Sequence, residues 1–229
     1  MRLPQWVRLP SGWIEDHGLH GLKWAPDGKG SDNTAALMAL TVIAHHADPE
    51  SGIARLTYDS LCQATGLSRS KLSNGLGVLE SIQVIGRMPD GRSTYGLANY
   101  SAVGGWGKFP ARSMYSSGGR VAAFEDFQLR SATELNAMKL FFLFVARRGR
   151  DTNMANISYD KITEYTGILK VKIKPAISLL AAQSLVYVER LPSQASELGV
   201  ANAYRIVGID SQVHMGTVGR RMDSADFAS

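Results

Sequence analysis

The chain has 229 residues, of which 45 % are hydrophobic, enough for one large soluble domain or for two of about 100 residues. It contains no apolar run near the roughly 18 residues of a membrane span, no signal-peptide pattern, and only one cysteine, Cys62, which excludes an intramolecular disulfide. The net charge of +5 and pI of about 9.4 favour an anionic partner, nucleic acid first. We therefore expect a cytoplasmic protein in which Cys62 acts as a small hydrophobe.

The sequence repeats itself at an offset of 101 residues. Leu56–Leu67 aligns without a gap with Ile157–Ile168: a tyrosine, an aspartate, a threonine and a glycine are identical, and the apolar positions coincide. A second similarity, at an offset of 100, relates Trp6–Pro10 to Trp106–Pro110. A gapless series of this kind indicates an internal duplication.

This repeat divides the chain into module one, residues 1–102, and module two, residues 103–209, which we expect to fold independently. Residues 210–229 lack apolar periodicity and are expected to form a flexible tail. The charge is uneven: residues 1–100 carry nine Lys or Arg and nine Asp or Glu, whereas residues 101–229 carry sixteen against eleven. The positive excess therefore lies in the second half.

In module one, hydrophobic periodicity and turn residues predict three helices followed by a hairpin. Helices are expected over Thr34–Ala47, over Tyr58–Thr65 and after Ser68, and strands over Val84–Arg87 and Thr94–Leu97. Thr57 can cap the second helix, and Gly66 can end it in the left-handed conformation of a tight turn. The third helix would bury Leu72, Leu76 and Leu79, with Gly75 and Gly77 allowing close packing.

Module two repeats this order with two departures. Its expected helices are Leu135–Arg147, Tyr159–Thr166 and Lys170–Gln183, and its strands are Val186–Arg190 and Ala203–Val207. Leu169 stands where module one has the capping Ser68, and Pro175 should delay the start of the third helix or kink it. The first helix is apolar nearly all round, with Phe141, Phe142 and Phe144; we expect most of this surface to be core, and one face could form a homodimer interface.

The patterns Ala36-Leu-x-Ala-Leu40, Leu56-Thr-Tyr-x-x-Leu61 and Thr65-Gly-Leu-Ser-Arg69 resemble the winged helix-turn-helix superfamily, in particular modules of phage and plasmid replication proteins and related bacterial regulators. The resemblance implies an α+β fold, mainly α, with two tandem winged helix-turn-helix domains. It also implies a sequence-specific double-stranded DNA-binding protein, either a replication initiator or a transcription regulator of a plasmid, phage or other mobile element, associated with the nucleoid. The alternative is a winged-helix scaffold that binds proteins without sequence-specific DNA binding.

In helix-turn-helix docking, the amino-terminal end of the third helix meets base edges in the major groove. Arginine there can bind guanine, asparagine adenine, and serine either a base or a phosphate, whereas lysine suits a phosphate. The DNA-binding residues expected in module one are Ser68, Arg69, Ser70, Lys71, Ser73 and Asn74, with Arg87 and Arg92 on the hairpin. Those expected in module two bind phosphates: Arg147, Arg148, Arg150, Lys170, Lys172 and Lys174. For all of them the alternative is a solvated basic face.

Other chemistry finds little support in the sequence. The pairs His45-His46 and His17-x-x-His20 suggest a metal, but no cysteine or acidic partner has the required spacing. There is no phosphate-binding Gly-Lys-Ser/Thr loop, nucleophile elbow or acidic metal cluster. We therefore expect neither an enzyme nor a cofactor.

Overall fold

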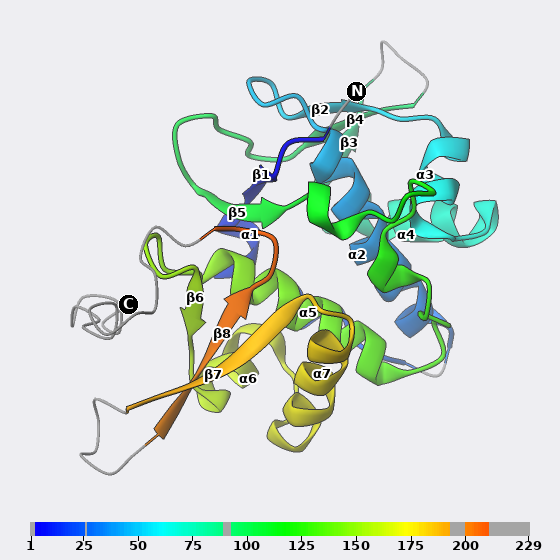
Figure 1. The fold of residues 1–229 in the computed structure, drawn as a ribbon. Coiled ribbons are helices and arrows are strands. Elements are labelled where there is room, and N and C mark those ends of the chain that lie inside the picture. Colours follow the sequence, from blue (N-terminus) through cyan, green and yellow to red (C-terminus); the bar gives the residue numbers. More distant parts are fainter. Residues whose placement is uncertain (1–2, 26, 89–92, 193–199, 211–229) are drawn as a thin grey trace.

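The computed structural model describes residues 3–25, 27–88, 93–192 and 200–210, which form an α+β fold of helices and small antiparallel sheets (Figure 1). The first half contains β1 (Trp6–Pro10), α1 (Gly12–Glu15), the 3-10 helix η1 (Gly18–Gly21), α2 (Lys29–His46), β2 (Ile53–Arg55), α3 (Tyr58–Thr65), α4 (Arg69–Ser81), β3 (Ile85–Arg87) and β4 (Thr94–Leu97). The second half contains β5 (Trp106–Pro110), the 3-10 helices η2 (Arg112–Met114) and η3 (Ala122–Phe124), α5 (Ala132–Ala146), β6 (Met154–Asn156), α6 (Tyr159–Thr166), α7 (Lys170–Ala182), β7 (Val186–Pro192) and β8 (Val200–Ile206). From α2 and from α5 onward, the same order of helix, strand, two helices and two strands therefore occurs twice.

Each half has a three-stranded antiparallel sheet, in the orders β2-β4-β3 and β6-β8-β7. The hairpins were expected from the sequence, but the short strands β2 and β6 were not. Each has only three residues, too few for an alternating hydrophobic pattern to stand out. Their place is set by pairing to a later strand, as when Ala54 lies opposite Tyr95.

The two halves are joined by a strand pair that treats them symmetrically. β1 and β5 run antiparallel with Arg8 opposite Lys108, Trp6 opposite Pro110 and Pro10 opposite Trp106. When a residue of β1 pairs with a residue of β5, the two residues that correspond to them at the offset of 100 also pair with each other. The same relation holds at the interface of a two-fold symmetric dimer. The side chains repeat this relation. Arg8 lies 5.4 Å from the Trp106 ring centroid, and Lys108 lies 4.8 Å from that of Trp6.

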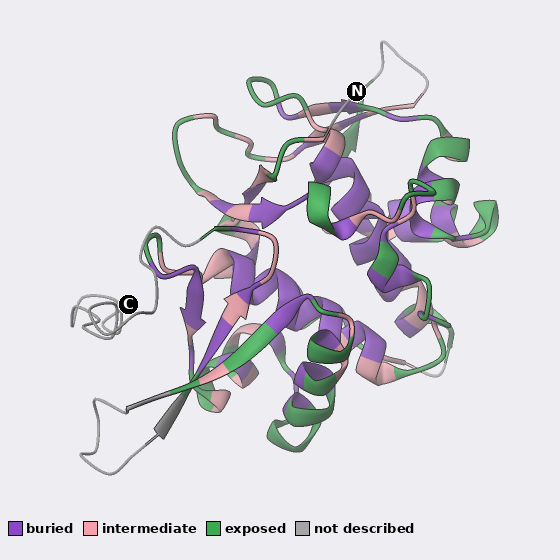
Figure 2. Ribbon diagram, viewed as in Figure 1, coloured by how far each residue is buried: buried purple, intermediate pink, exposed green. Residues whose placement is uncertain are grey.

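The hydrophobic core is continuous across the two halves. α2 packs against α5 near the middle of the molecule, and both helices are buried along most of their length (Figure 2). Phe109 of β5 lies between them, with its ring centroid 5.0 Å from that of His45 and 5.3 Å from that of Phe142. The expectation of two independently folding modules therefore has no support in the packing.

The phenylalanines of α5 face the chain's own core. Phe141 and Phe142 contact Phe109, and Phe144 stacks on Tyr204 with a centroid distance of 4.2 Å. All three phenylalanines are fully buried, as expected of core residues. The homodimer face that was also considered on this helix finds no support there, because the chain itself covers the helix. No helix in the described ranges is long and apolar enough to cross a bilayer.

Candidate nucleic-acid interface

Each half contains two short helices joined by a tight turn. In the first half α3 begins after Thr57, whose hydroxyl accepts an amide hydrogen bond of the first turn, as expected, and ends at Gly66 with φ of 72°. The buried Thr65 hydroxyl donates to the Leu61 carbonyl at 2.6 Å and accepts from the Leu67 amide at 3.2 Å. One threonine side chain therefore fixes both sides of the turn.

The second half builds its turn in the same way. Gly167 has φ of 67°, and the Thr166 hydroxyl donates to the Ile162 carbonyl and accepts from the Ile168 amide at 3.2 Å. Ser158 caps α6 as Thr57 caps α3. The Thr-Gly pair that the two halves share in sequence is therefore explained by one local geometry that requires both residues.

Each turn is also covered by a segment from the other half. A Cβ at Gly66 would lie 2.0 Å from the guanidinium of Arg120, and one at Gly167 would lie 2.9 Å from the ring of His20. Further contacts cross in both directions: the Val121 amide donates to the Ala64 carbonyl at 2.9 Å, and η1 packs on α6. The position of each pair of short helices thus depends on the segment that follows β1 or β5 of the opposite half.

The orientation of α4 agrees with the sequence prediction. Leu72, Leu76 and Leu79 are fully buried, and the Ser68 hydroxyl accepts the Lys71 amide hydrogen bond at 3.2 Å as the N-cap. Side chains at the amino-terminal end therefore face outward, and those exposed are Arg69, Ser70, Ser73 and Asn74.

Of the two glycines of α4, only one is needed for close packing. A Cβ at Gly75 would lie 2.8 Å from the backbone of Ala35 and Ala36, whereas a Cβ at Gly77 would meet nothing within 4 Å. The packing role predicted for Gly77 is therefore wrong, because this residue lies on the solvent face.

Several polar side chains of α4 already have intramolecular partners. Arg69 forms an ion pair with Asp59 of α3. Lys71 Nζ lies 2.7 Å from Asp32 Oδ1, and the Asn74 amide donates to the same carboxylate at 3.3 Å. The Arg69–Asp59 pair is well exposed and is worth at most about 1 kcal/mol, so it can open for another anion. Lys71 is more deeply placed and is held by α2, which favours a structural role over a phosphate contact.

The helix α7 presents more cationic charge. Its buried stripe is Ile173, Ala176, Ile177 and Leu180, so Lys170, Lys172 and Lys174 are all exposed. Lys170 pairs with Asp160, the counterpart of the Arg69–Asp59 pair at the offset of 101. For Lys172 and Lys174, no ion pair exists within the part of the chain that the structure describes. The helix has no side-chain N-cap, as predicted, yet it starts at the same repeat position as α4, so Pro175 does not delay it.

The remaining predicted DNA-binding cations differ in accessibility. Arg147 lies 3.1 Å from Glu15 and stacks on Tyr165. Arg148 is half-buried and donates to the carbonyl oxygens of residues 149 and 150, and burial lowers the pKa of its guanidinium. Arg87 pairs with Glu80 at 2.7 Å. Arg150 is exposed, and Arg92 lies outside the described residues. Arg147 and Arg148 therefore hold the two halves and a turn together rather than forming a free basic face.

The histidines of the two sequence pairs contact other parts of the chain. His17 stacks on Tyr165 of α6 with a centroid distance of 4.8 Å, and His20 lies against Gly167. Burial, with a smaller effect of the neighbouring His46, lowers the pKa of His45 to about 3 and keeps it neutral. Within the described ranges no three His, Cys, Asp or Glu side chains gather as a metal site. Cys62 is half-buried, and burial raises its thiol pKa.

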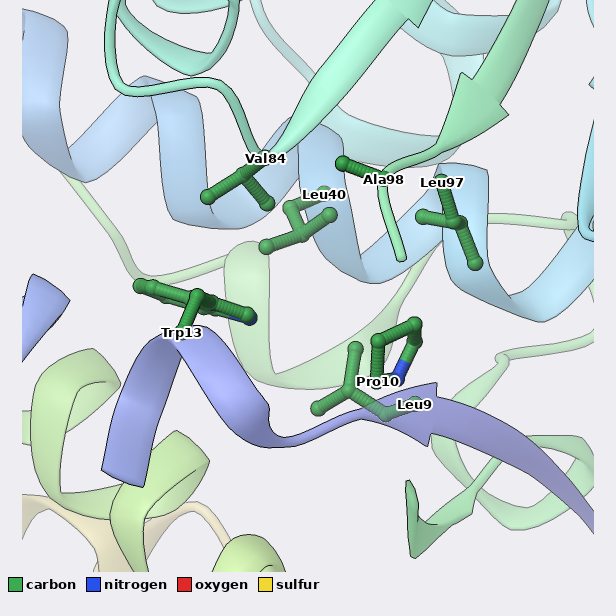
Figure 3. A pocket seen from close by; sticks show the side chains of 7 residues that line it. All are labelled: Leu9, Pro10, Trp13, Leu40, Val84, Leu97 and Ala98. Atoms are coloured by element: carbon green, nitrogen blue, oxygen red, sulfur yellow. The ribbon is translucent and has the colours of Figure 1, made fainter. Parts of the chain in front are cut away.

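An apolar hollow lies between β1 and the core of the first half (Figure 3). Its cavity volume of about 10 Å³ is far below the roughly 300 Å³ of small-molecule sites, and its walls include Leu9, Trp13, Leu40 and Leu97. It offers no converging polar side chains, so it does not resemble a substrate pocket.

Sequence reasoning missed two exposed apolar residues at the amino-terminal end of α7. The side chains of Leu169 and Val171 are 66 % and 76 % exposed. The internal repeat could have revealed Val171, because at the offset of 101 this residue corresponds to Ser70, which is exposed.

The chain matches no protein-family model, no curated protein and no solved structure.

Proposed function

We propose that the chain is a site-specific double-stranded DNA-binding protein built from two winged helix-turn-helix modules. The observation that carries the proposal is the repeated unit: two short helices joined by a threonine-braced glycine turn, preceded by a helix and a strand and followed by a hairpin. This is the element order of a winged helix, and the second helix of the pair would enter the major groove. α4 and α7 are the two reading helices.

The chemistry of the two reading helices supports a division of labour. α4 exposes Ser70 and Ser73, with Arg69 in a weak surface pair, and these groups can form hydrogen bonds with base edges. α7 exposes Lys172 and Lys174, which suit phosphates and a salt-dependent affinity. Specificity should therefore come mainly from α4 and non-specific affinity mainly from α7.

The symmetric β1–β5 pair supports binding by a single chain. Helix-turn-helix regulators commonly place two reading helices on DNA by forming a two-fold symmetric dimer. Here the antiparallel register centred on Arg8 and Lys108 relates the two halves within one chain. One molecule would thus present two non-identical reading helices, suited to a site with two different halves. A role in replication initiation or in transcription regulation is compatible with this arrangement.

The rival function is a scaffold that binds proteins. In the first reading helix, α4, the cations Arg69 and Lys71 form ion pairs with aspartates of the same chain. These ion pairs favour the scaffold for the first half. A salt titration separates the two. Affinity for a duplex selected from a random pool should fall steeply with salt, with a log–log slope of several units. No duplex binding at low salt, or a flat salt response, would favour the scaffold.

Two substitutions test the assignment of the reading helices. Arg69→Ala should lower affinity for the selected duplex by about 1–3 kcal/mol and leave random duplex little changed. Lys172→Ala should weaken both duplexes by a similar factor and lower the salt slope by about one. Arg130→Ala removes an exposed cation that precedes α5, and this control should change neither affinity. Equal losses on both duplexes for Arg69→Ala would make it a phosphate contact.

A further inference from the structure

The exposed face of α7 combines apolar side chains with lysines. Val171 is 76 % exposed and Leu169, just before the helix, is 66 % exposed. Packing of Ile173 and Ile177 against α5 fixes the rotation of the helix. Val171 therefore points to solvent, and Lys174 and Pro175, one turn later, lie on the same face.

The corresponding face of α4 has a different chemistry. At the offset of 101, Ser70 corresponds to Val171, Ser73 to Lys174 and Asn74 to Pro175. All six side chains are exposed. The first reading helix thus offers hydroxyl and amide groups, whereas the second offers an isopropyl group and a proline ring that can neither donate nor accept a hydrogen bond.

The charge around the apolar face identifies its occupant. Three exposed lysines lie close to Val171 along the helix: Lys170, Lys172 and Lys174. This pattern fits a polyanion better than an apolar protein surface, because contact with an apolar surface would remove water from the charged lysines at a cost in free energy. In the major groove of DNA the apolar group that distinguishes one base from the others is the C5-methyl of thymine. A polyanion with methyl groups at the depth of a reading helix is duplex DNA containing thymine.

We propose that α7 reads thymine through contact of the Val171 methyl groups, flanked by Pro175, with the thymine C5-methyl, while the neighbouring lysines bind phosphates. This inference rests on the proposed function and adds the base that the second half recognises. It also assigns a role to Pro175: the residue that removes a helical hydrogen bond supplies an apolar surface to the groove.

Replacement of thymine by deoxyuridine tests the proposal, because it removes only the methyl group and keeps base pairing and phosphates. The probe is a duplex selected from a random pool with the full-length protein, resynthesised with single thymine-to-deoxyuridine changes. We expect about fourfold weaker binding at the position read by Val171, which is the transfer free energy of one buried methylene expressed as an affinity ratio.

Variants then assign the effect to the residue. Val171→Ala should bind the thymine duplex more weakly and lose the thymine-to-deoxyuridine ratio at that position, as a double-mutant cycle requires of interacting groups. Ser70→Ala, at the matching position of α4, should keep the ratio. Thermal unfolding checks that both variants fold.

The outcomes separate the two levels of the proposal. If salt-dependent duplex binding persists but no thymine change alters affinity, or if Val171→Ala keeps the ratio, the thymine inference is overturned and the proposed function stands. If no duplex binds at any salt concentration, both fail.

Discussion

Lys139 offers a stability test whose magnitude follows from its surroundings. This residue of α5 is 3 % exposed, and its Nζ donates to the Leu22 carbonyl at 2.8 Å. Burial, with a smaller effect of Lys23, lowers the pKa of Lys139 from 10.5 to about 8. At roughly 1.4 kcal/mol per pH unit, folding with the amine protonated costs about 3 kcal/mol. Met38 stands at the matching position of α2, also buried, so Lys139→Met is the natural replacement.

We expect Lys139→Met to raise the free energy of unfolding at pH 7 by about 1–2 kcal/mol. The relief of the charge is partly offset because the Leu22 carbonyl loses its donor, at a cost of about 1–2 kcal/mol. The advantage should shrink between pH 8 and 10.5. In this window the folded wild-type protein releases the proton while the unfolded chain keeps it, so wild-type stability rises with pH.

Urea unfolding of both proteins at pH 7, 8.5 and 10 measures this difference. Lys174→Met, the same substitution on the exposed face of α7, is the control and should show no pH-dependent difference. A variant less stable than wild type at pH 7, or a difference that stays constant up to pH 10, would refute the reasoning that the buried amine carries a desolvation penalty.

Three further predictions follow from the packing. We expect no cooperative thermal transition when residues 1–102 and residues 103–209 are expressed as separate fragments. Each fragment lacks the partner strand of the β1–β5 pair and the central helix, α2 or α5, that completes its core, so a sharp transition in either fragment would contradict the shared core. Gly75→Ala should lower the free energy of unfolding, measured in urea, by about 1–3 kcal/mol, because the added Cβ meets the backbone of α2. Gly77→Ala should raise it by up to about 1 kcal/mol, because its Cβ meets nothing and alanine favours the helix; similar effects of the two substitutions would contradict this packing. Asp32→Asn should tighten duplex binding several-fold at low salt, because the substitution removes a negative charge beside α4 and frees the ammonium group of Lys71. A binding titration measures this, and an unchanged affinity would place α4 away from the DNA.

Elements fixed by local interactions could be predicted from the sequence alone. Thr57 and Ser68 cap helices through hydrogen bonds to an amide three residues ahead, and Gly66 ends α3 because glycine adopts a positive φ freely. The leucine stripe of α4 follows from a period of 3.6 residues, and burial of that stripe decides which side chains face outward. Both α4 and the exposure of Arg69 were therefore predictable.

What depends on contacts between distant segments was decided only by the tertiary structure. The sequence could show that Trp6–Pro10 resembles Trp106–Pro110, but only the register shows that the two strands pair across the molecular centre. Lys71 and Asp32 are 39 residues apart in sequence, so nothing in the sequence around Lys71 indicates that its ammonium group forms an ion pair with a carboxylate. The apolar pattern of α5 left open a face for a second copy, whereas β5, β8 and α2 of the same chain cover its phenylalanines. Hydrophobic pattern identifies a face that must be buried, but it does not identify the partner that buries it, because the driving force is proportional to area and has no direction.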